Sequence, residues 1–131
     1  MRKPLLALSL AVVAEPASVW AHHSFASEFD ADQPVSLHGT VTKVEFINPH
    51  SWIHIEVTNE DGTKTAWEVE GGTPNTLFRK GINDNSLAIG TAVSVDGYKA
   101  RDGSNRMSGR DITLADGRKV FLSGSAPPQQ L

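Results

Sequence analysis

The chain has no cysteine, which excludes disulfide bonds, thiolate metal sites and cysteine nucleophiles. It also lacks runs of basic residues: 12 Lys and Arg residues stand against 15 Asp and Glu residues. Nucleic-acid phosphates are bound by clusters of Lys and Arg, so no nucleic-acid partner is expected. Neither the G-x-S-x-G nucleophile motif nor a glycine-rich phosphate-binding loop occurs. What the chain does contain is one set of export signals, several strand-like runs and two groups of histidines.

Residues 1–21 have the pattern of a secretory signal peptide. Arg2 and Lys3 form a short positive region, and the apolar run at residues 5–14 is too short to span a membrane. Residues 19–21 read V-W-A and supply a cleavage site that ends at Ala21. We therefore predict a periplasmic or secreted protein with no membrane span after the signal peptide is removed. The remaining 110 residues carry 10 basic and 14 acidic side chains, a formal charge of −4.

The rest of the chain divides into an N-terminal arm at residues 22–34, one domain at residues 35–122 and a tail at residues 123–131 that is predicted to be disordered. Strand-like runs occupy residues 35–47, 51–58, 64–70, 91–100, 107–114 and 119–122. A capped helical pattern fills residues 73–81, between the third and fourth runs. The order predicts an all-β fold with one short helix, an OB-like five-stranded small β-barrel. A β-sandwich is less favoured because it needs more strands.

The run at residues 51–58 alternates between two faces. One face is aliphatic, whereas the other carries His50, Trp52, His54 and Glu56. A turn at Asp61 would pair strand positions whose numbers sum to about 122. This register places His54 opposite Glu68 and Trp52 opposite Glu70, with both glutamates facing outward. The predicted core residues are Ile53, Ile55, Trp67, Val69, Val93 and Val95.

The histidines suggest a metal site. Cleavage after Ala21 would leave His22 with a free α-amine and an imidazole, two nitrogens that can chelate one metal ion. Cleavage one residue earlier would instead form a square-planar chelate through His23. The predicted metal ligands are His22, His23, His50 and His54, and copper or zinc suits this nitrogen-rich set. Metal binding by the first two requires the N-terminal arm to fold back over the barrel, with two phenylalanines of the arm as anchors.

Several motifs together resemble one known family. They read A-H-H-S-F at residues 21–25, G-T-V at 39–41, N-P-H-S-W at 48–52, E-G-G at 70–72, D-G-S-N at 102–105 and D-G-R-K-V-F at 116–121. The chain is similar to a family of small exported bacterial proteins that contain a domain of unknown function (domain of unknown function 6152 type). The resemblance implies export and a small β-barrel. It implies no reaction and no catalytic residues.

Two further functions compete with metal binding. The first is a binding module without metal, in which the ligand face around Trp52 and Glu68 engages a peptide, a sugar or a protein partner. In that prediction Trp52 is a single exposed aromatic residue without Lys or Arg neighbours. The second is a hydrolase-like enzyme that uses His54 and Glu68 as an acid/base pair. The missing catalytic motifs give the enzyme the least support of the three.

Overall fold

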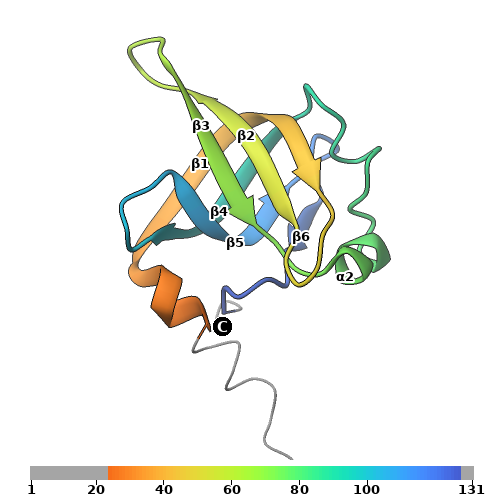
Figure 1. Cartoon of the computed structure of the whole chain (residues 1–131). Helices are drawn as coiled ribbons and strands as arrows, with labels where there is room; N and C mark the ends of the chain where they lie inside the picture. The colour runs from red at the N-terminus through yellow and green to blue at the C-terminus, as the bar shows by residue number, and fades with distance from the viewer. Residues whose placement is uncertain (1–23, 128–131) are drawn as a thin grey trace, which may run out of the picture.

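The computed structural model describes residues 24–127, so the predicted signal peptide, His22 and His23 lie outside the described residues. A helical turn at residues 24–28 comes first (Figure 1). The elements that follow are β1 (Phe29–Glu45), β2 (Trp52–Thr58), β3 (Lys64–Glu70), α2 (Pro74–Arg79), β4 (Ala92–Ala100), β5 (Arg106–Thr113) and β6 (Lys119–Phe121). Among residues 24–127, no helix has the length and apolar character needed to cross a membrane.

The strands form one sheet in the order β3-β2-β1-β4-β5-β6, and an additional pairing between β3 and β5 closes it into a barrel (Figure 1). The closing pair is parallel, whereas the other neighbours are antiparallel. The helix α2 lies between β3 and β4 in the chain. This is the five-stranded architecture of an OB-like barrel, so the predicted fold class is confirmed. The three-residue β6 is an addition beside β5.

The strand β1 is the longest element and serves both halves of the barrel. It pairs with β4 through residues 29–40 and with β2 through residues 40–45. The register shifts between Val41 and Lys43, where a bulge lets the strand bend from one neighbour to the other. β1 starts at Phe29, whereas the sequence pattern placed the start of this strand at Val35. The apolar pattern missed the extra residues because most of them are exposed.

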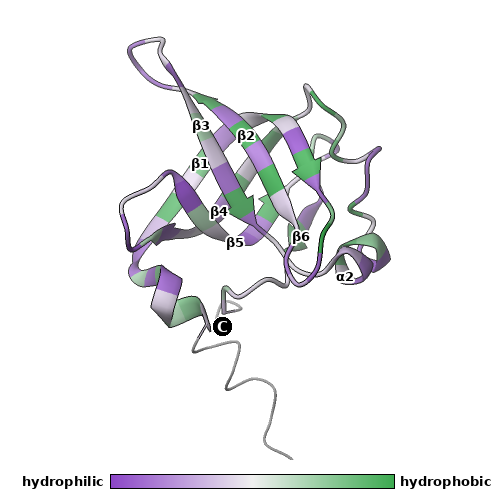
Figure 2. Ribbon diagram, viewed as in Figure 1, coloured by the Kyte–Doolittle hydropathy of each residue, from purple (hydrophilic) through white to green (hydrophobic). Residues whose placement is uncertain are grey.

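The β2–β3 hairpin has the predicted register. His54 pairs with Glu68 and Trp52 pairs with Glu70. Hydrophobic and hydrophilic residues alternate along β2, as Figure 2 shows. Of the predicted core residues, Trp67 is partly buried and packs against the core, and the other five are buried: Ile53, Ile55, Val69, Val93 and Val95.

The helix α2 closes one end of the core. Its cap is Thr73, whose Oγ1 accepts a hydrogen bond from the backbone N–H of Thr76 at 3.3 Å. Gly81 ends it with a φ of 80°, in the left-handed region that glycine tolerates best. Leu77 and Ile82 are fully buried and attach the helix to the barrel. The predicted helix signals are confirmed.

A second, smaller hydrophobic cluster joins the two ends of the described chain. It contains Phe25, Phe29, Ala100 and Ala126, with Tyr98 packed against it. Phe25 lies in the helical turn and Phe29 begins β1, with their ring centroids 5.9 Å apart. Residues 123–127 therefore depart from the prediction of a disordered tail. They run along one end of the barrel towards the helical turn, because Ala126 finds an apolar surface there (Figure 1).

Candidate functional site

The corner between β1 and β2 presents His50 at the edge of the barrel. The next residue, Ser51, is buried and clamps the corner to the end of β3 with two backbone hydrogen bonds. Its N–H donates to the carbonyl of Gly72 at 2.9 Å, and its carbonyl accepts from the N–H of Gly71 at 2.8 Å. The His50 side chain is 31% exposed, and its Nδ1 lies 3.7 Å from Oε2 of Glu70. The clamp therefore holds the imidazole beside the last residue of β3.

Glu70 is a buried carboxylate, only 2% exposed. Its Oε1 accepts hydrogen bonds from the N–H of Ser125 at 2.9 Å, from the Ser125 hydroxyl and from the Ser108 hydroxyl at 3.3 Å. The sequence pattern predicted an outward-facing Glu70, and this prediction is wrong. The side chains of β3 alternate between the two faces of the strand as expected. However, closure of the barrel brings β5 beside β3, and residues 123–127 cover the Glu70 side chain.

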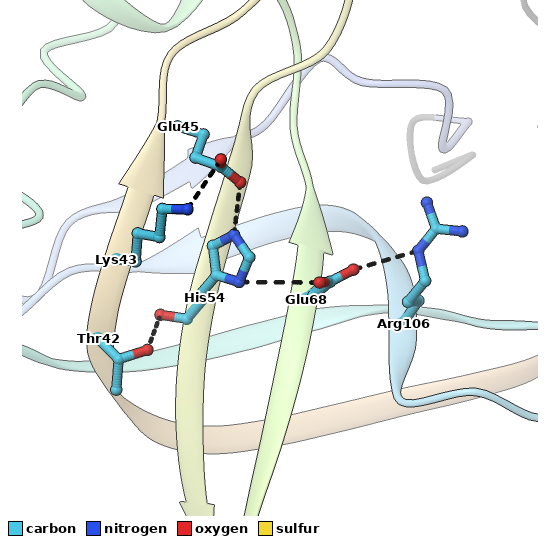
Figure 3. A network of polar contacts seen from close by, with 6 residues as sticks. All are labelled: Thr42, Lys43, Glu45, His54, Glu68 and Arg106. Carbon is cyan, nitrogen blue, oxygen red and sulfur yellow. Dashed lines mark hydrogen bonds and ion pairs between the residues drawn. The ribbon is translucent and has the colours of Figure 1, made fainter.

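His54 lies on the outer face and contacts two carboxylates (Figure 3). Its Nε2 is 2.8 Å from Oε2 of Glu45, and its Nδ1 is 3.9 Å from Oε1 of Glu68. Glu45 also pairs with Lys43 at 2.9 Å. Hydrogen bonds from His54 and then from Lys43 hold the pKa of Glu45 below its ordinary value. The Nε2 nitrogen of His54 is therefore engaged by Glu45, whereas its Nδ1 lies beyond hydrogen-bond distance of Glu68.

Trp52 on the same face is covered by Arg106, the first residue of β5. The guanidinium carbon lies 4.7 Å from the indole centroid, within the range of a cation–π interaction. Nε of Arg106 is also 3.4 Å from Oε2 of Glu68 (Figure 3). The prediction that Trp52 has no basic neighbour is therefore wrong. Arg106 is far from Trp52 in the sequence. It lies beside Trp52 because β3 and β5 pair in parallel, and a local sequence pattern does not predict this pairing.

The structure does not bring the predicted metal ligands together as one set. His22 and His23 lie outside the described residues. His50 and His54 face different carboxylates. Within residues 24–127, no group of three or more histidine, aspartate or glutamate side chains has an arrangement that could hold a metal ion. His38 stands apart from both, with its Nδ1 2.8 Å from the hydroxyl of Ser94.

The start of the described chain packs against the segment that covers the Glu70 carboxylate. Phe25 is 5% exposed and its ring packs edge-on against Tyr98, with centroids 5.5 Å apart. It shares its cluster with Ala126, and the preceding residue, Ser125, holds Glu70. Arg101 adds two hydrogen bonds to the same segment, from its Nε to the carbonyl of Ala26 at 2.8 Å and from its backbone N–H to the carbonyl of Glu28 at 2.9 Å.

The closed barrel with its helix between β3 and β4 defines an OB-like protein. Residues 9–109 match a family described as a family of unknown function (DUF6152), and the chain belongs to that family. No curated protein matches the chain. Among solved structures, the chain is similar to the N-terminal domain of PriB from Thermoanaerobacter tencongensis, described as dimeric. The identity is 26%, the match covers 64% of this chain and 97% of that one, and the TM-score is 0.43.

Proposed function

We propose that this is an exported protein that binds one Cu(II) or Zn(II) ion at the His50 corner. Removal of residues 1–21 would give His22 a free α-amine, and its imidazole, that of His23 and that of His50 supply further nitrogens. Amine and imidazole nitrogens suit Cu(II) and Zn(II). The proposal leaves His54 out, because its Nε2 is already engaged by Glu45 at 2.8 Å and its Nδ1 faces Glu68 rather than the His50 corner.

The observation that carries the proposal is the anchoring of the N-terminal segment. Phe25 is buried in the cluster that contains Ala126, and Ser125 contacts Glu70, which faces His50. Three residues of extended chain span about 10 Å at most, so the proposal requires the His50 corner to lie within this reach of Phe25. Anchoring also lowers the entropic cost of collecting ligands from distant parts of the chain.

The test is a metal titration of the processed protein. Intact mass first establishes that the chain begins at His22, and calorimetry then measures Cu(II) and Zn(II) binding at neutral pH. We expect one equivalent to bind and His50→Ala to weaken binding tenfold or more. His54→Ala is the matched control and should change the affinity less than threefold. A chain that retains Ala21 would bind copper through the square-planar chelate at His23 instead, so the intact mass must exclude this form before the titration.

Two results would count against this function. If the processed protein binds no stoichiometric metal at neutral pH, the proposal fails. If it binds one equivalent but His50→Ala leaves the affinity unchanged, the metal is held by the chain end alone and the corner has no part in the function.

A second candidate function is binding of a peptide, a sugar or a protein partner on the outer face of β2, without metal. It is favoured by the cluster of Trp52, Arg106, Glu68 and His54, which offers an aromatic ring beside both signs of charge. However, Arg106 covers one side of the indole, so a stacking ligand would have to use the other side or displace the guanidinium. A panel of peptides and oligosaccharides screened against the wild type and Trp52→Ala would test this function independently of metal.

A further inference from the structure

We propose that two copies of this chain associate through an apolar patch formed by the end of β1, the helix α2 and the segment that follows α2. The patch consists of Phe46, Ile47, Phe78 and Ile89, together with a groove beside Ile89. Each copy would offer the same patch, as in most homodimers, whose two copies are related by a two-fold axis. The inference goes beyond the proposed function and needs no metal ion.

The first support is the position of the exposed hydrophobic side chains. Within residues 24–127, the large hydrophobic residues that are exposed are Ile89 at 77%, Ile47 at 50% and Phe78 at 46%. Such residues are normal on a surface when they are scattered. Here the Phe78 ring packs on that of Phe46, with centroids 4.9 Å apart, and Ile47 is the next residue along the chain. An apolar surface that is gathered in this way is typical of a protein–protein contact.

The second support is a groove that continues the patch from β1 to the segment after α2. Its volume is about 420 Å³. Its walls are formed by Lys43, Val44, Asp84, Leu87, Ala88 and Ile89. Val44 and Phe46 are two residues apart and both pack, half-buried, against the main core. The groove is therefore next to the ridge that Phe46 and Phe78 form. In Figure 1 the end of β1, α2 and residues 82–91 gather at the same side of the barrel.

The third support is the charge beside the patch. Arg79 follows Phe78 on the ridge, whereas Asp84 lies on the wall of the groove, and both are exposed. Within residues 24–127, neither side chain forms a salt bridge. The other arginines of this part of the chain each form one: Arg101, Arg106, Arg110 and Arg118. The ridge thus carries a positive charge and the groove a negative charge, and neither is balanced by an ion pair among the described residues.

These features favour a second copy over an unrelated partner, because the patch is complementary to itself. A two-fold axis near Phe46 would place the ridge of each copy against the groove of the other. Each Phe78 would then cover the apolar wall at Ile89, and each Arg79 would face an Asp84. Opposite charges at both ends of a contact fix its orientation and exclude arrangements in which like charges meet. The patch involves one strand end and two short segments, so we expect a reversible dimer rather than a permanent one.

Sedimentation equilibrium of the processed protein measures this association directly. A chelator is present throughout, so that a metal ion cannot bridge two copies. We expect a monomer–dimer equilibrium that depends on protein concentration. Ile89→Ser should weaken the association tenfold or more, since the exposed side chain contributes to the contact and little to the fold. Circular dichroism of each variant establishes that the barrel is retained.

The charge pair is tested by exchange. Arg79→Glu alone and Asp84→Arg alone should each weaken the dimer fivefold or more, because each places like charges opposite one another. The double variant should return the affinity to within threefold of the wild type. Lys99→Glu is the matched control, since Lys99 is an exposed residue of β4 outside the patch, and it should change the affinity less than twofold. If a charge reversal prevents folding, Arg79→Gln and Asp84→Asn replace it, and each should still weaken the dimer.

Three outcomes would overturn the inference. A wild type that stays monomeric at every soluble concentration would refute the dimer. A dimer that Ile89→Ser and the single charge variants leave unchanged would use another surface. A dimer that the charge exchange does not restore would refute the two-fold arrangement. None of these results bears on the metal titration, so this inference and the proposed function can fail separately.

Discussion

Replacing Phe25 with Ala should detach the N-terminal segment and weaken metal binding without unfolding the barrel. Phe25 is 5% exposed and belongs to the small cluster with Phe29 and Ala126, separate from the main core. The side chain therefore couples the segment to the barrel but contributes little to the barrel itself.

The magnitude follows from what the ring contacts. Full burial of a phenylalanine side chain contributes about 1.5–3 kcal/mol, and each favourable aromatic pair adds about 0.5–1.5 kcal/mol. Phe25 has two such neighbours, Phe29 at 5.9 Å and Tyr98 at 5.5 Å between centroids. Phe→Ala changes in cores cost about 3–5 kcal/mol, and a cluster at the edge of the molecule can partly collapse. We expect a loss of about 3 kcal/mol from the docking of the segment.

Hydrogen exchange and calorimetry measure the two consequences separately. The backbone N–H of Arg101 donates to the carbonyl of Glu28, so its exchange rate reports whether the segment is docked. We expect faster exchange at Arg101 in Phe25→Ala, together with metal binding weakened tenfold or more. Phe78→Ala is the matched control. Phe78 is 46% exposed on α2, so its loss should leave both measurements near the wild-type values.

Two results would refute the reasoning. Unchanged exchange at Arg101 would mean that Phe25 does not anchor the segment. Faster exchange with wild-type metal affinity would mean that docking of the segment plays no part in binding, and the proposed site would lose its main support.

Three further predictions concern stability and processing. Ile55→Ala should destabilise the barrel by about 2–5 kcal/mol in a urea titration, because Ile55 is fully buried in the main core, and a loss below about 0.5 kcal/mol would contradict its position. Because hydrogen bonds from His54 and Lys43 lower the pKa of Glu45, this carboxylate binds fewer protons when folded than when unfolded. Its contribution is present above about pH 4.3 and is lost as the pH falls through its folded pKa, so Glu45→Gln should make acid unfolding less steep. The exported chain should begin at His22, and an intact mass that includes residues 14–21 would exclude the predicted cleavage.

The sequence alone predicts the parts of the fold that depend on neighbouring residues. Alternation of apolar and polar side chains placed Ile53 and Ile55 inside, and the turn at Asp61 set the pairing of His54 with Glu68. The helix was predicted from its cap and its terminal glycine. Each of these features is encoded within about ten residues, so a linear pattern is sufficient to find it.

The parts that the sequence could not predict depend on closure of the barrel. Arg106 reaches Trp52 because β5 pairs in parallel with β3 at one end. Residues 123–127 were expected to be disordered because they lack periodicity, yet Ser125 and Ala126 are buried. A short segment without regular structure can be held by one buried hydrogen-bond acceptor and one apolar contact, and neither leaves a periodic signal in the sequence.

The burial of Glu70 shows how closure can turn a surface position into a candidate site. On an open hairpin, Glu70 would share the solvent-facing side of β3 with Glu68, and both would pair with whichever cation lay across the strand. Closure separates the two residues. Glu68 stays on the outer face, between His54 and Arg106. Glu70 is covered, and its hydrogen bonds leave one oxygen directed at His50. Glu68 therefore belongs to a network of opposite charges at the surface, whereas Glu70 is compensated by buried hydrogen bonds from Ser108 and Ser125 and holds His50 at the corner beside it.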